Sequence, residues 1–300
     1  MLDVSGANGD VADPAATPMR HRPALQRRIW LCADDYGIST AVNAAIRDLV
    51  LRGRLNATSV MVNTPTFNRS EALPLRMLNV GADRVAIGLH VTLTAPFKPL
   101  TRTFRPLRDG TFLSIEQTLW GGLLRRFNVR DVEAEVSAQI AEFVKAFGRL
   151  PDFIDGHQHV HLMPQIRDGV LNAVRASAPD AWVRQCGRAL PLHRRFADHK
   201  GLVLDWLSRS FRARATRLGL RTNAAFAGTY DFQTATPFAQ LFPRFLDDLP
   251  DGSVVMCHPG FVDAELKRLD PLTNLREHEY AFFVGEAFPS LLRSRDVALA

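Results

Sequence analysis

Short apolar runs alternate with longer stretches of helical spacing along most of this chain. Runs typical of buried strands lie at residues 29–33, 58–63, 85–90, 151–157, 181–186 and 253–257, and residues 225–232 are undecided. Helical spacing follows at 39–53, 69–78, 131–148, 164–174, 201–218, 237–249 and 276–293. Strands that alternate with helices form parallel βαβ units. The pattern therefore predicts an α/β fold, a distorted (β/α) TIM-like barrel of about seven strands, with an open doubly wound sheet as the alternative.

Residues with known preferences for helix ends support these boundaries. Ser39 can cap the first helix and Gly53 can end it. The clearest helix, 131–148, carries an apolar stripe at every third or fourth position and ends at Gly148. Residues 95–114 are rich in proline, arginine and threonine, and they predict a long excursion between two elements.

The two ends of the chain differ in organisation. Residues 1–28 carry acids and prolines where a signal peptide would need a basic start and an apolar stretch. We expect them to form a disordered N-terminal extension, and we expect residues 29–300 to form one domain. No run of about 18 apolar residues occurs, so no transmembrane segment is expected.

The composition narrows the function classes only a little. Hydrophobic residues make up 46% and charged residues 23%, as in ordinary globular proteins. The net charge of +6 indicates a solvated basic surface, and the aromatic residues follow core spacing, so a nucleic-acid partner is not expected. Three scattered cysteines form no CxxC pair, which favours a reducing, cytoplasmic setting.

Polar groups follow the carboxyl ends of four predicted strands. These groups are Asp34 and Asp35, His90, Asp155 with His157, and His258. Ligands of parallel α/β folds collect at this edge of the sheet, so residues distant in sequence would meet there. Two adjacent carboxylates repel each other unless a cation lies nearby. The alternatives are a capping acid at a turn and hydrogen-bonded histidines near the core.

The segment IDGHQHVHLMP, residues 154–164, places three histidines at alternate positions. In an extended backbone their side chains would point to one side. Imidazole is the commonest protein metal ligand, but the chain turns into a helix near Pro164. We therefore expect one ligand, His157. His159 and His161 would lie behind it, bind substrate or simply be loop residues.

Four motifs, in this order, resemble the YdjC family of chito-oligosaccharide and hopanoid-biosynthesis deacetylases. They are ADDYGIS (33–39), GLHVTL (88–93), DGHQHVHLMPQI (155–166) and MCHPG (256–260). The resemblance covers residues 28–293 and implies a metal-dependent hydrolase on a distorted (β/α) barrel. Such an enzyme removes acetyl groups from N-acetylated amino sugars. It further implies Asp35, His90 and His157 as metal ligands and Asp34 as catalytic base.

This ligand set implies one divalent ion with open coordination positions. Magnesium or zinc is expected, with manganese or nickel as alternatives, because mixed oxygen and nitrogen ligands do not select one metal. His258 is the candidate acid for the leaving amine. His159 and His161 are the candidate substrate-binding groups.

Partners follow from the same resemblance and from one basic stretch. The expected substrate is an N-acetylated sugar or glycolipid, and a homodimer is a family expectation. Residues 209–221 carry five arginines, with Phe211, Ala215 and Leu218 as a buried face. This stretch is a solvated helix face or a contact for an anionic substrate or a membrane surface. The rival functions are another metal-dependent hydrolase, such as a phosphodiesterase, and a non-catalytic sugar-binding protein.

Overall fold

The computed structural model describes residues 26–189, 199–231 and 236–300. Most of the expected N-terminal extension, residues 1–25, lies outside the described residues. Its last two residues, Arg27 and Arg28, are the first residues of strand β1. The ordered sheet therefore begins two residues before the expected boundary at Ile29.

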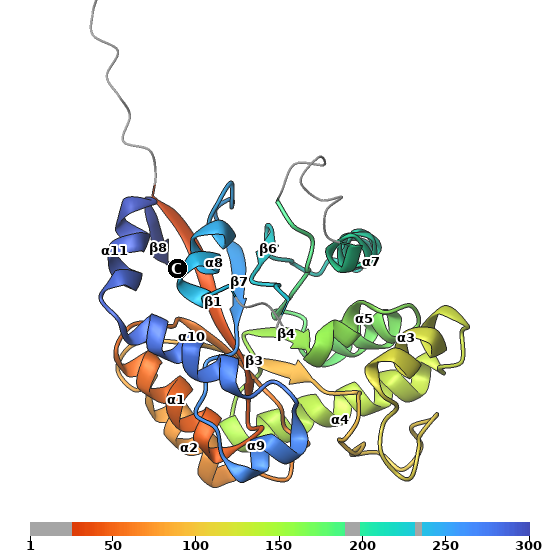
Figure 1. Ribbon diagram of the computed structural model, residues 1–300. Helices are drawn as coiled ribbons and strands as arrows, with labels where there is room; N and C mark the ends of the chain where they lie inside the picture. The colour runs from red at the N-terminus through yellow and green to blue at the C-terminus, as the bar shows by residue number, and fades with distance from the viewer. Residues whose placement is uncertain (1–25, 190–198, 232–235) are drawn as a thin grey trace, which may run out of the picture.

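A curled sheet of parallel strands forms the centre of the molecule (Figure 1). The described residues hold β1 (Arg27–Tyr36), β2 (Ala57–Val60), β3 (Ala86–Val91), β4 (Phe153–Gly156), β5 (Trp182–Val183), β6 (Phe226–Ala227), β7 (Ser253–Cys257) and β8 (Val297–Leu299). Their order is β5-β4-β3-β2-β1-β7-β6, and β8 pairs with β1. The predicted distorted (β/α) barrel is confirmed, with seven strands in the curled path and β8 as an unpredicted addition.

The two edges of the sheet meet through isolated contacts instead of a regular ladder. Val183 of β5 donates a backbone hydrogen bond of 2.9 Å to Arg221, and Phe226 of β6 donates one of 3.0 Å to Gly187. Both strands at this seam are only two residues long. The distortion of the barrel is therefore concentrated between β5 and β6, where the sequence pattern was also weakest.

Helices cover the outside of the sheet (Figure 1). They are α1 (Thr40–Leu51), α2 (Arg69–Met77), α3 (Ile115–Leu123), α4 (Val129–Phe147), α5 (Ile166–Ser177), α7 (His199–Arg217), α8 (Phe238–Phe245), α9 (Ala264–Leu269), α10 (Asn274–Val284) and α11 (Ala287–Ser294). Helix α4 matches its prediction: its apolar stripe is buried, and it ends at Gly148, whose φ of 71° suits glycine. Strands β2, β4 and β7 are buried at every residue, as parallel strands covered on both faces should be.

Two helix predictions need correction. The final helix expected at 276–293 is two helices, α10 and α11, because the backbone becomes extended at Gly285 (φ −68°, ψ 155°). Buried Phe283, Phe288 and Leu292 on the two pieces imitate one continuous stripe. Helices α3 and α9 were not predicted, since each has fewer than ten residues and only a few buried positions.

Candidate metal centre

The last residues of strand β1 carry both acids and form an irregularity in the strand. Its pairing register with β2 shifts between Ala33 and Tyr36, and Asp35 adopts a left-handed φ of 68°. Successive side chains of a regular strand point to opposite faces. The irregularity at Asp35 breaks this alternation, so the Asp35 side chain departs from the direction that a regular strand would give it. Few residues other than glycine adopt such a φ, and those that do cluster at functional sites. Both carboxylates are almost fully buried.

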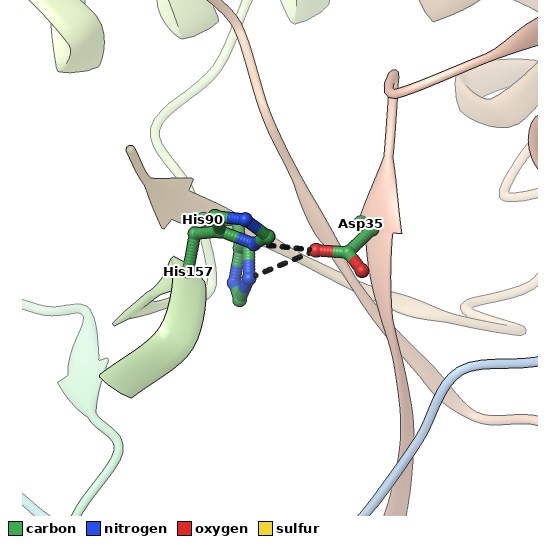
Figure 2. A group of neighbouring side chains, drawn as sticks. All are labelled: Asp35, His90 and His157. Carbon is green, nitrogen blue, oxygen red and sulfur yellow. Dashed lines mark hydrogen bonds and ion pairs between the residues drawn. The ribbon is translucent and has the colours of Figure 1, made fainter. Parts of the chain in front are cut away.

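Asp35, His90 and His157 converge from three strand ends (Figure 2). Asp35 Oδ1 lies 2.9 Å from His157 Nδ1 and 3.3 Å from His90 Nε2. One atom from each residue lies within 4.8 Å of the others, and all three residues are buried. One carboxylate oxygen and two imidazole nitrogens at this spacing fit a divalent ion and leave coordination positions open.

His90 is oriented from behind by a second acid. Its Nδ1 lies 2.7 Å from Asp155 Oδ1 and 3.0 Å from Ser59 Oγ, which leaves Nε2 facing Asp35. Burial alone would lower the pKa of His90, but the carboxylates of Asp155 and Asp34 raise this pKa to about 10. Metal-binding histidines usually have such a carboxylate partner on the other ring nitrogen. The sequence pattern indicates Asp155 only as one of the polar groups at strand ends.

The histidine segment forms a short 3₁₀ helix, η1 (His157–Leu162), and not an extended strand. Gln158 and His159 are left-handed, with φ values of 52° and 57°, so the segment is not extended and the three histidines do not share one side as they would in a strand. His157 is the one beside Asp35, as expected. His161 Nε2 lies 2.9 Å from the carbonyl oxygen of Arg184.

His159 and His161 are held among buried groups next to the centre. His159 Nδ1 lies 3.6 Å from Cys186 Sγ, and the ring packs edge-on against Phe226. Burial lowers the pKa of each histidine to about 3, so both are neutral at pH 7. A substrate-binding role for them stays a prediction. His159 is the more exposed of the two.

Asp34 is not free, because Arg184 holds both of its oxygens. The Nη1–Oδ2 distance is 2.6 Å and the Nη2–Oδ1 distance is 2.7 Å. Arg184 Nη2 also lies 2.6 Å from Asp155 Oδ2. Burial raises the pKa of Asp34, but the charge and hydrogen bonds of Arg184, together with the charge of His90, keep this pKa well below its ordinary value. Sequence reasoning missed Arg184, which follows the two-residue strand β5.

Arg184 also decides between two clusters that could hold metal in the described residues. Cys32, Asp34 and Asp155 form the second one. The guanidinium lies between the two carboxylates of that cluster and 3.0 Å from Cys32 Sγ. It therefore supplies the cation that those acids require. In the Asp35 cluster an arginine contacts only Oδ2, and Oδ1 still faces the two imidazoles.

Helix α10 contributes two buried charged residues that sequence reasoning also missed. Arg276 Nη2 donates to Asp35 Oδ2 at 2.7 Å. One turn later, Glu279 accepts hydrogen bonds from the His258 backbone N–H and the Tyr230 hydroxyl, both at 2.6 Å. Arg276, Glu279 and Phe283 follow helical spacing on the buried side, so charges on an apolar stripe were the available signal.

Comparison with known proteins decides the family of the chain. The model of the YdjC-like protein family matches residues 28–294. The chain belongs to the YdjC-like family. A chitooligosaccharide deacetylase from Escherichia fergusonii is 27% identical to this YdjC-like protein over 250 residues, which cover 81% of this chain and 86% of the relative.

Among solved structures, the YdjC-like protein resembles a candidate cellobiose-phosphate cleavage protein from Enterococcus faecalis V583. The TM-score is 0.71 at 22% identity, and the match covers 92% of this chain and 97% of the other. This likeness shows the barrel fold.

His258 follows strand β7, as predicted, and its backbone is fixed by Glu279. Burial lowers the pKa of His258 below its ordinary value, which keeps the imidazole neutral at pH 7. Its role as an acid stays a prediction. The ring would have to take up a proton before it could give one to a leaving amine.

The basic stretch near α7 partly matches its expected burial. Phe211 and Ala215 are fully buried and Leu218 is partly buried. Arg214 pairs with Asp168 at 3.1 Å, and Arg209 and Arg212 are exposed. In the described ranges, no helix has the length and apolar character needed to cross a membrane. Contact with a membrane surface stays a prediction.

Proposed function

We propose that this YdjC-like protein is a metal-dependent carbohydrate N-deacetylase. The observation that carries the proposal is the convergence of Asp35 Oδ1, His90 Nε2 and His157 Nδ1 at the carboxyl ends of β1, β3 and β4. The name of the Escherichia fergusonii relative supports an N-acetylated amino sugar as substrate. The expected substrate is an N-acetylated oligosaccharide or a glycolipid, and the expected setting is the cytoplasm.

These three side chains would hold one divalent ion. Zinc, manganese and nickel accept two imidazoles more readily than magnesium does. When bound, the ion supplies a polarised acetamide carbonyl and a water with a lowered pKa. Asp155 orients His90 for this task, and Arg276 contacts the outer oxygen of Asp35.

Proton transfer would fall to the residues beside the ion. Asp34 stays ionised next to Arg184 and would accept a proton from the attacking water. Arg184 would keep the Asp34 carboxylate in place during this step. His258, which is neutral at pH 7, would first take up a proton and then give it to the leaving amine, and the Glu279 contact would hold the His258 backbone. His159 and His161 would line the substrate side of the centre.

A two-metal phosphodiesterase is the main rival, and one contact argues against it. Such enzymes hold a second ion roughly 3.5–4 Å from the first. In the described residues, the remaining candidate cluster is already neutralised by Arg184. A non-catalytic sugar-binding protein would have no use for a buried ionised acid beside a metal centre.

The test is a panel of N-acetylated substrates, from chitobiose to acetylated glycolipids, assayed for free acetate with and without chelator. We expect chelator-sensitive release that divalent metal restores, and loss of release in His157→Ala. Exposed His278→Ala is the matched control. Phosphodiester hydrolysis without acetate release would contradict the proposal.

A further inference from the structure

Arg276 is buried against the acid that would hold the ion. Its side chain is 0% exposed, and Nη2 lies 2.7 Å from Asp35 Oδ2 and 3.0 Å from Asp270 Oδ2. Its Nε donates to the carbonyl oxygen of Leu272 at 2.9 Å. Within the described residues, Nη1 has no hydrogen-bond partner. The guanidinium thus approaches Asp35 through one nitrogen and contacts one oxygen.

A cation in this position acts against binding of a metal ion. It repels a divalent ion in a buried setting where charges are weakly screened. Burying a guanidinium is also unfavourable before its ion pairs are counted. Asp270 shares Arg276 Nη2 with Asp35 and so neutralises part of this charge.

The position of the contact suggests what Arg276 does. Asp35 Oδ1 faces the two imidazoles, and Oδ2 faces Arg276. A carboxylate with both oxygens available can chelate an ion through both. With Oδ2 occupied, Asp35 has a single oxygen to offer, and one more coordination position stays open for water or the substrate carbonyl.

We propose that Arg276 is a positioning residue that restricts Asp35 to one ligand oxygen and weakens ion binding at this centre. The proposal rests on the proposed metal site. The arginine also withdraws electron density from the carboxylate, which strengthens the ion as a Lewis acid. If Arg276 had a purely structural role, the opposite result would be expected, because its loss would let Asp35 move and would lower the affinity for the ion.

The first experiment measures the affinity of Arg276→Met for Zn²⁺ and Mn²⁺ by competition with a chelator, using the full chain. We expect the affinity to rise about tenfold or more, since a buried like charge is removed, while deacetylation slows. Co²⁺ absorption should weaken, because a second Asp35 oxygen raises the coordination number. Arg276→Lys, which keeps the charge, should return the affinity toward that of the wild type.

A second variant tests the same proposal without changing Arg276. Asp270→Asn removes the carboxylate that shares Arg276 Nη2, so the arginine should bind Asp35 more strongly. We expect weaker ion binding, by about threefold to tenfold. This variant decides the matter if Arg276→Met does not fold.

The exposed pair Arg268 and Glu265 provides matched controls, because its nitrogen–oxygen distance is also 3.0 Å. Arg268→Met and Glu265→Gln should leave ion affinity unchanged. Equal or weaker binding in folded Arg276→Met would overturn the proposal, and so would unchanged binding in Asp270→Asn. If the wild type binds no ion through Asp35, His90 and His157, the proposed function itself fails, which is a separate result.

Discussion

Asp34 and Asp35 are neighbours in the chain, yet each is held by its own arginine in a different way. Arg184 contacts both oxygens of Asp34, whereas Arg276 contacts one oxygen of Asp35. The other oxygen of Asp35 faces His90 and His157. Two identical side chains thus acquire different chemistry through the number of oxygens that a guanidinium occupies. An acid held at both oxygens stays an ionised neighbour, and an acid held at one can bind an ion.

Removal of the Asp35 charge should have the largest effect on ion affinity and on acetate release. In Asp35→Asn we expect ion affinity to fall by more than about 100-fold, because loss of an outer partner of a ligand already costs 10–100-fold. Acetate release should drop to background. Metal content after gel filtration and acetate release measure the two effects. A variant that still holds one ion per chain would show that Asp35 is not a ligand.

The corresponding change at Asp34 should separate the two acids. Asp34→Asn should keep its ion, since Asp34 does not face the imidazoles, but it should lose about 10²–10⁴-fold in turnover as a missing general base. The measurements are the same as for Asp35→Asn, so the pair forms its own control. Wild-type turnover would remove Asp34 as the base. Loss of metal as large as in Asp35→Asn would show that the two acids act as one site.

Removal of the Asp155 charge, which lies behind His90, should have an intermediate effect on ion affinity. Asp155→Asn weakens the contact at His90 Nδ1, now 2.7 Å long, and should lower ion affinity about tenfold to 100-fold. Ser59→Ala removes the longer 3.0 Å partner of the same nitrogen and serves as the matched control with a smaller loss. Titration with Zn²⁺ against a chelator measures both. Equal losses in the two variants would contradict a special role for the carboxylate.

The metal candidates were predictable from sequence, whereas the arginines that assign their roles were not. Parallel strands bring their carboxyl ends to one edge, so the polar groups that follow the apolar runs were expected to meet there. The resemblance to the YdjC family then implied Asp35, His90 and His157 among them as the metal ligands. Arg184 follows a strand of two residues and resembles any surface cation in the sequence. It pairs with an acid 150 positions away, a contact that no local pattern encodes.

Backbone detail set the other limit on prediction. Alternating histidines are typical of an extended segment. In η1 this pattern is broken by left-handed backbone at Gln158 and His159, and neither residue is a glycine, so the sequence gives no sign of it. The same holds for Asp35 at the end of β1. Gly88, by contrast, has a physical reason visible in the structure: a Cβ there would lie 2.4 Å from the Phe153 ring. The GLH motif therefore lets β3 pack closely enough to place His90.

The smallest expected effect, taken for one pH unit, is a dependence of ion binding on pH at the Asp35 cluster. Burial lowers the pKa of His90, but Asp155 and Asp34 outweigh burial and raise this pKa to about 10. The imidazole must be neutral to bind an ion, so the ion must displace a proton from it. Ion affinity should therefore rise with pH between 6 and 8, by about tenfold for each unit when one proton is displaced.

Calorimetry in two buffers of different ionisation enthalpy measures the number of protons released for each ion bound. His159 and His161 do not contribute in this range, since the pKa of each is lowered to about 3. In Asp155→Asn the pKa of His90 should fall, so the slope of affinity against pH should flatten near pH 8. An affinity that is independent of pH in the wild type would show that His90 is not protonated before the ion binds, and that its carboxylate neighbours tune its orientation alone.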